Sequence, residues 1–178
     1  MCTLKPEIAM AVSRLTPDQP LSRRAWFAAI VSGAGLLAAA CSAGGSQVLD
    51  TPDGRVLQYE GDDLLILVSG LQKSYQLGDQ MHLNLLVNNQ GTGFVQIKLR
   101  TKVLGRADQP VVQPEPVMLE VKSDDASNSD QAFTLPRDLL PGDYTLAVEV
   151  PPWKVDGREF GVGATLRAPV RLNPASDQ

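Results

Sequence analysis

The run Val95-Gln96-Ile97-Lys98-Leu99-Arg100-Thr101-Lys102-Val103 decides the fold class of this chain. Its odd positions hold Val, Ile, Leu, Thr and Val, and its even positions hold Gln, Lys, Arg and Lys. Successive side chains of a strand point to opposite faces, so this period of two predicts a strand with one face in a core and the other in water. The three basic residues on the wet face discourage pairing with a foreign strand.

Other segments on both sides of this run also predict strands. Segment 81–88 alternates in the same way, and the continuous apolar run 64–68 predicts a strand covered on both faces. Segment 89–93, Asn-Gln-Gly-Thr-Gly, predicts a hairpin-type connection. Further strands are expected at 117–121, 132–135, 144–150 and about 165–172.

The remaining segments carry turn and loop signals. Segment 105–116 is rich in Pro and Gln, and 123–131 is polar and acidic, so both are predicted to be loops. The pattern as a whole predicts an all-β fold, a single β-sandwich of seven to eight antiparallel strands over residues 51–173. The polar tail 174–178 is expected to be disordered.

The stretch Leu139-Leu140-Pro141-Gly142-Asp143-Tyr144-Thr145-Leu146 resembles the strand-F corner of immunoglobulin-like and fibronectin-type-III-like domains. In those domains a Tyr near the start of the strand turns its hydroxyl onto upstream backbone. The resemblance implies an Ig-like sandwich in which Tyr144 is the structural corner. It identifies an architecture only, because such sandwiches host unrelated functions.

Residues 1–40 have the features of a signal peptide. Arg23 and Arg24 supply positive charge, the uncharged run 25–40 follows, and small residues end it. The run is shorter than the roughly 20 residues of a membrane span. Ser22-Arg23-Arg24-Ala25-Trp26-Phe27 resembles the twin-arginine export motif, which implies export by that route. The alternative is an ordinary secretory signal that carries two arginines.

Leu37-Ala38-Ala39-Ala40-Cys41 resembles a bacterial lipobox. The resemblance implies that Cys41 becomes the first mature residue and carries diacylglycerol through a thioether. One departure is Ala38, where that family usually has Leu. The same small residues also suit ordinary signal peptidase, which would release a soluble product beginning at Cys41, and an uncleaved anchor is a third reading. Segment 41–50 is predicted to be a flexible tether.

The cysteine and charge counts limit which disulfides and which partners the exported part can have. The chain has two cysteines, and Cys2 leaves with the leader, so the mature domain has no internal disulfide. The leader holds four of the 16 basic and two of the 20 acidic residues, which leaves 12 basic, 18 acidic and a net charge of −6. Such a surface repels phosphate backbones, so nucleic acid is not expected as a partner.

Catalytic and metal-binding patterns are weak. His82 is the single histidine and lies on the polar side of its predicted strand, which favours a surface histidine over a ligand or a catalytic base. Asp124, Asp125, Asn128 and Asp130 have the hard oxygen atoms that Ca²⁺ prefers, but they lack the EF-hand spacing. A solvated acidic loop is the simpler interpretation, and no metal or cofactor is predicted.

The segment Trp153-Lys154-Val155-Asp156-Gly157-Arg158-Glu159-Phe160 is the candidate partner-binding loop. It joins the last two predicted strands at one end of the sandwich, where such folds commonly bind. Trp153, Arg158 and Phe160 have the composition of a binding hot spot. The alternative is that Trp153 and Phe160 fold back to cap the core.

These features predict a non-catalytic binding or assembly module, held by the lipid on Cys41 to the cell membrane and facing the periplasm or the cell exterior. Its expected partner is an envelope protein or a glycan. The alternatives are an accessory subunit or inhibitor that docks on an exported enzyme, and a hydrolase with an unrecognised site.

Overall fold

The computed structural model describes residues 45–52 and 54–175. The chain divides into two units, 1–41 and 42–178, and the described residues belong to the second. They form strands and one short 3-10 helix, which confirms the all-β prediction. Arg23, Arg24 and Cys41 lie outside the described residues. The elements are β1 Gly45–Thr51, β2 Gly54–Gly61, β3 Leu64–Leu71, β4 Ser74–Gln76, β5 Gln80–Asn89, β6 Val95–Leu104, η1 Arg106–Asp108, β7 Pro110–Val112, β8 Val117–Val121, β9 Asp125–Thr134, β10 Gly142–Val150, β11 Trp153–Val155, β12 Arg158–Phe160 and β13 Ala164–Asn173.

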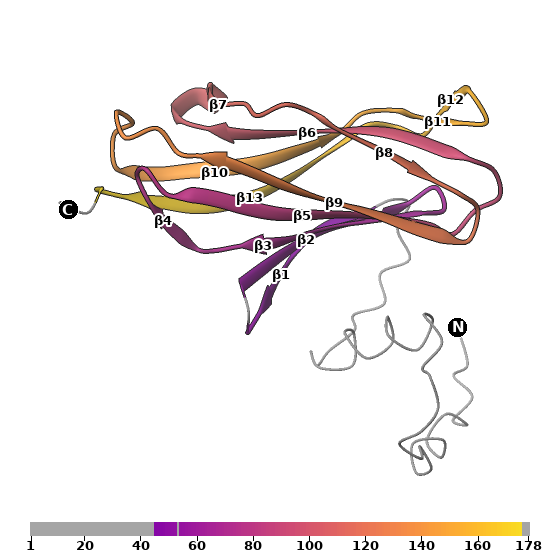
Figure 1. Cartoon of the computed structure of the whole chain (residues 1–178), viewed down its shortest axis with the longest axis horizontal. Coiled ribbons are helices and arrows are strands. Elements are labelled where there is room, and N and C mark those ends of the chain that lie inside the picture. Colours follow the sequence, from indigo (N-terminus) through magenta and orange to yellow (C-terminus); the bar gives the residue numbers. More distant parts are fainter. Residues whose placement is uncertain (1–44, 53, 176–178) are drawn as a thin grey trace, which may run out of the picture. The chain divides into compact units, whose positions relative to one another are not determined.

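The strands form two sheets that lie in two layers, as in a β-sandwich (Figure 1). The first sheet has the order β1-β2-β3-β5-β9, and all its pairs are antiparallel. The second has the order β12-β11-β6-β10-β13-β4, with β7 and β8 also paired to β6. Its one parallel pair is β13 with β4. The described residues hold thirteen strands, more than the seven to eight predicted. Strands β1 and β2 were not predicted, and the predicted loops contain the short strands β7, β11 and β12.

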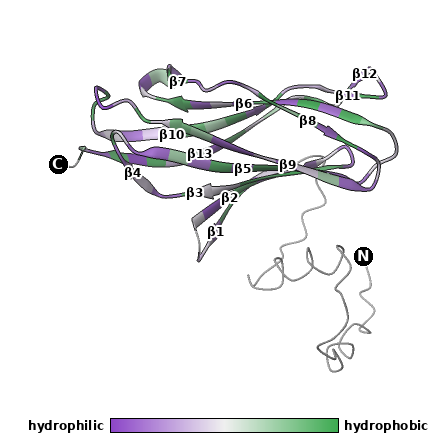
Figure 2. Cartoon of the chain, viewed as in Figure 1, coloured by the Kyte–Doolittle hydropathy of each residue, from purple (hydrophilic) through white to green (hydrophobic). Residues whose placement is uncertain are grey.

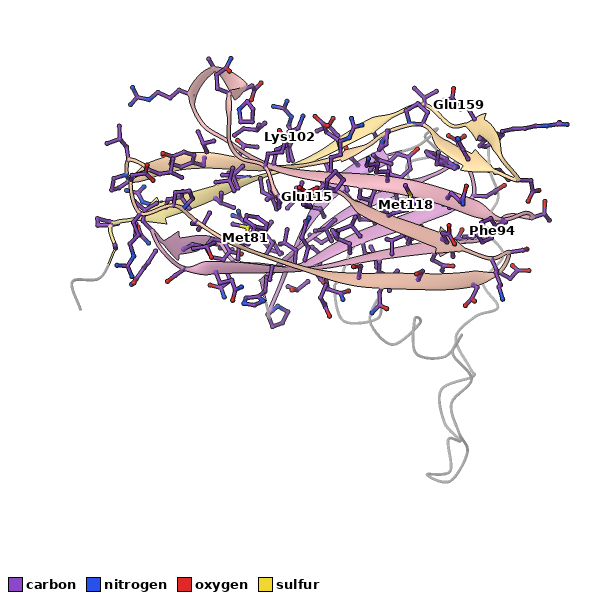
Figure 3. All side chains as sticks on the ribbon, turned by 45° about the horizontal axis from the view of Figure 1, so that its top comes forward. Met81, Phe94, Lys102, Glu115, Met118 and Glu159 are labelled. Atoms are coloured by element: carbon purple, nitrogen blue, oxygen red, sulfur yellow. The ribbon has the colours of Figure 1, made fainter. Side chains whose placement is uncertain are left out.

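The alternating patterns that predicted the two central strands are confirmed. In β5 and β6 the apolar positions face the core and are buried: Met81, Leu83, Leu85, Val87, Val95, Ile97, Leu99 and Val103. Figure 2 shows the alternation along the strands, and Figure 3 shows Met81 between the two layers. Each large apolar side chain buried in this way stabilises the fold by about 1.5–3 kcal/mol.

Thr101 is the polar residue on the inner face of β6, and it is fully buried. Its hydroxyl donates to Oε1 of Gln131 on β9 at 2.6 Å, and Nε2 of Gln131 donates to the Glu115 carbonyl at 2.7 Å. A buried polar group is costly unless it is hydrogen-bonded. The two hydrogen bonds therefore give the buried side chains of Thr101 and Gln131 the partners they need between the two sheets.

Segment 123–131 is not the acidic loop that the sequence predicted. Residues from Asp125 onward belong to β9, which pairs with β5 along ten residues. Only the end of this strand was predicted, at 132–135. The part before it was missed because β9 is the last strand of its sheet, and its inner-face positions there include small polar residues instead of large apolar ones. Pairing to a well-formed neighbour decides its conformation.

Two other sequence predictions were wrong, and a third was right only in part. Segment 89–93 does not close a hairpin, because it carries the chain from β5 in one sheet to β6 in the other. The run 64–68 is buried on one face only: Leu65 and Leu67 of β3 are half-buried on the outer face. Segment 105–116 is partly structured, since it holds η1 and β7.

The predicted tether 41–50 is also corrected. Residues from Gly45 onward form β1, which pairs in continuous register with β2, from Gly45 opposite Glu60 to Thr51 opposite Gly54. Every residue of β1 is exposed, so no apolar period marked the strand, and its backbone pairing alone defines it. The folded unit therefore begins before residue 51, and only residues 42–44 separate Cys41 from the first strand.

Candidate functional site

The candidate loop 153–160 is a short hairpin that extends the second sheet. Strand β11 pairs with β6 and with β12, and the two hairpin strands meet at Asp156 and Gly157. These two residues have φ of 50° and 82°, which suits a tight hairpin turn that needs positive φ twice. The Asp156 N–H donates to the Phe94 carbonyl at 2.9 Å, and the Phe94 N–H donates to Oδ1 of Asp156 at 2.8 Å. The turn is thus tied to the connection 89–94.

Trp153 is not a contact residue on the surface, because only 1% of it is exposed. It lies opposite Phe160 in the hairpin, and its ring belongs to the hydrophobic core. The Trp153 ring packs edge-on to Tyr59 of the opposite sheet, with centroids 6.3 Å apart and planes at 74°. The core-capping alternative is therefore correct for Trp153, and the exposed-anchor prediction is wrong for it.

The neighbours of Trp153 explain why a glycine follows Phe160. A Cβ atom on Gly161 would lie 2.3 Å from the Trp153 ring, and Gly161 has φ of 79°. The backbone at this position therefore lies directly against the indole ring, where no larger residue fits without a shift. The indole Nε1 is buried and has no hydrogen-bond partner among the described residues.

The outer part of the hairpin does present apolar surface. Phe160 is 50% exposed while its ring still contacts Trp153, with centroids 6.3 Å apart. Val162, which sequence reasoning missed, is 81% exposed, and it stands between Gly161 and Gly163. Its position between two glycines is a sequence signal that could have indicated an exposed side chain. Arg158 is exposed and forms no ion pair with any residue that the structure describes.

Tyr144 occupies the place that the sequence predicted for it. It lies near the start of β10, and its hydroxyl donates to the Leu140 carbonyl at 2.6 Å. The ring is partly buried against the core. This hydrogen bond ties the segment 135–141 to the strand that follows.

His82 and the acidic residues of segment 123–131 do not come together as a metal-binding group in the part of the chain that the structure describes. His82, Asn84 and Asp130 line a shallow depression of about 210 Å³ on the outer face of the first sheet, next to Gly70. The Asp130 carboxylate accepts its hydrogen bond from Asn84 at 2.8 Å. Across residues 45–52 and 54–175, His, Asp and Glu do not gather into a group that could hold a metal ion.

Charged groups join β1 and β2 to the opposite sheet. The Arg55 guanidinium donates to Asp50 at 3.1 Å and to the Pro169 carbonyl of β13. The hydrogen bond from Arg55 holds the pKa of Asp50 below its usual value, and Lys73, 3.4 Å away, acts in the same direction. Near the hairpin, burial raises the pKa of Tyr59, and the negative charge of Asp62 adds to this.

Comparison with known proteins gives remote likenesses only. No family model matches the chain, and no curated protein matches it. A β-glucosidase from Listeria innocua, in complex with glucose, matches 63% of this chain with 12% identity and a TM-score of 0.48, and the match spans 16% of the enzyme. Spo0M, a sporulation control protein from Bacillus subtilis, matches 64% of this chain and half of its own length, with 15% identity and a TM-score of 0.39. Such likenesses indicate no function. Within the described part of the chain, no helix is long and apolar enough to cross a membrane.

Proposed function

We propose that this protein is an exported lipoprotein whose Ig-like sandwich is a non-catalytic binding or assembly module of the cell envelope. The observation that carries the proposal is the position of Cys41. The lipobox-like sequence ends four residues before Gly45, where β1 begins. The boundary between the two units of the chain falls one residue after the proposed cleavage site, between residues 41 and 42. Cleavage before Cys41 would therefore leave every described strand intact.

Lipid attachment is tested by Cys41→Ser. Two or three acyl chains hold a protein stably on a membrane, whereas one gives only marginal binding. The wild-type protein is expected in the membrane fraction, and the Cys41→Ser variant is expected to leave it. A variant that stays in the membrane fraction after cleavage would contradict the lipid anchor.

The export route is tested by replacing Arg23 and Arg24 together with Lys. This change keeps the charge and removes the guanidinium geometry that a receptor reads. Unprocessed precursor is expected to accumulate in the cytoplasm. Normal export of the double variant would favour the general secretory route.

One observation favours the alternative of an accessory subunit that docks on an exported enzyme. Leu65, Leu67 and Leu86 form an apolar group on the outer face of the first sheet, where Leu67 pairs with Leu86. Contiguous apolar surface of this kind marks protein interfaces. If it is an interface, Leu67→Ser should abolish association with the enzyme. The matched change Met118→Ser, at a 58% exposed position on the other sheet, should not.

A further inference from the structure

The connection 89–94 gathers three turns at one end of the two-layered unit. The Gln90 N–H donates to the Asp63 carbonyl at 2.8 Å, the Ser123 hydroxyl donates to the Gly91 carbonyl at 2.9 Å, and Asp156 bonds Phe94 as described above. These bonds join the β2–β3 turn, the β8–β9 turn and the β11–β12 hairpin. We call this end the hairpin end; Figure 1 shows it on the right.

The first residues of β1 lie at the hairpin end. Gly45 pairs with Glu60 and Ser46 with Tyr59, just before the β2–β3 turn. The ring of Tyr59 contacts Trp153, and Trp153 contacts Phe160. A continuous line of contacts therefore runs from the start of β1 to the exposed ring of Phe160.

Covalent reach limits how far this end can stand from a lipid on Cys41. Gly45 follows Cys41 by four residues, which span at most about 14 Å when fully extended. The opposite end, which carries Leu140 and the Tyr144 corner, is separated by the nine residues of β10, or about 30 Å. An anchored domain that stands upright must therefore direct its hairpin end to the bilayer.

Exposed apolar side chains also lie where β12 leaves this hairpin, at and after the residue that pairs with Trp153. Phe160 is 50% exposed and Val162 is 81% exposed, and we call these two residues the Phe160–Val162 patch. The buried Trp153 supports the patch from below, which holds Phe160 in place. Aromatic and aliphatic side chains on a folded surface enter the boundary between headgroups and acyl chains.

We infer that the Phe160–Val162 patch rests in the interface of the bilayer that holds Cys41, so that the domain stands on the membrane through two contacts. The inference rests on the proposed lipid anchor. The charged residues of this end are Asp62, Asp63, Asp124, Asp125, Asp156 and Glu159 against Lys122, Lys154 and Arg158, and this excess of carboxylates is repelled by anionic headgroups. The contact is therefore apolar in character and favours zwitterionic lipid.

The test uses the full-length lipidated protein in phosphatidylcholine vesicles that carry bromine near the top of the acyl chains. The Cys41 thiol is consumed by the lipid, and Cys2 is the one other cysteine of the chain, in the leader. Val162→Cys and Leu140→Cys can therefore each carry a single thiol-reactive fluorophore. The two positions are matched, since Leu140 is 79% exposed and lies at the opposite end.

Bromine quenches a fluorophore that enters the upper acyl region, within the roughly 5–10 Å that interfacial segments reach. We expect loss of fluorescence from the fluorophore at position 162 and no loss from the one at position 140. When phosphatidylglycerol is added, the loss at position 162 should become weaker. No loss at either position in protein with a lipidated Cys41 would overturn the inference and leave the anchor standing. Loss at both positions would show a domain lying flat and would overturn it too. Mass spectrometry that finds no lipid on Cys41 would remove both the anchor and the inference.

Discussion

Tyr144 lies near the start of β10, and Trp153 lies at the start of β11, which follows β10 in the chain. The two aromatic residues stabilise their parts of the sheet in different ways. At one end the Tyr144 ring is partly buried, and its hydroxyl bonds the Leu140 carbonyl. At the other end Trp153 is buried almost completely, and its Nε1 has no partner among the described residues. The Tyr144 end depends on one surface hydrogen bond, and the Trp153 end depends on packing. An aromatic residue in a segment that reads as a loop can therefore belong to the core.

Among the substitutions that test this comparison, Trp153→Ala should cause the largest loss of stability. Removal of a buried Trp side chain costs on the order of 3–5 kcal/mol of the free energy of unfolding, because it leaves a cavity beside Tyr59. Denaturant unfolding measures the loss. Phe160→Ala is the control, since Phe160 is half-exposed and should cost clearly less. Equal losses for the two variants would mean that Trp153 is not the residue that holds the hairpin.

Gly161→Ala should give the next largest effect. The added Cβ would lie 2.3 Å from the Trp153 ring, and overpacking of this kind costs about 1–3 kcal/mol. Gly157→Ala is the matched control, because Gly157 has a similar φ of 82° with no atom within 4 Å of the added Cβ. The positive φ alone costs roughly 1–2 kcal/mol. Thermal melts that show no excess loss for Gly161→Ala would contradict the contact with Trp153.

Tyr144→Phe should give the smallest effect. It removes one hydroxyl that bonds the Leu140 carbonyl and keeps the ring, so the expected loss is about 0.5–1.5 kcal/mol. Urea unfolding of the variant, with an unchanged circular dichroism spectrum, measures it. An unfolding midpoint equal to that of the wild type would indicate that water replaces the hydrogen bond at no cost.

Parts of this fold were predictable from sequence, and the reasons are local. Strands β5 and β6 alternate over enough residues to reveal their inner face, and the hydrogen bond of Tyr144 was expected from the resemblance of segment 139–146 to a strand-F corner. Strand β1 and the part of β9 before residue 132 were missed because pairing to a neighbour, and not an apolar period, defines them. The three-residue β11 is too short to show a period. The burial of Trp153 could not be predicted from the local sequence, because the ring packs on Tyr59, which lies far away in the sequence.

We propose that Cys41 carries the lipid that holds this sandwich on a membrane. The decisive measurement is intact-mass and peptide mass spectrometry of the mature protein. We expect an N-terminus at Cys41 with diacylglycerol on its sulfur. A free thiol on Cys41, or a mature chain that begins elsewhere, would rule the lipid anchor out.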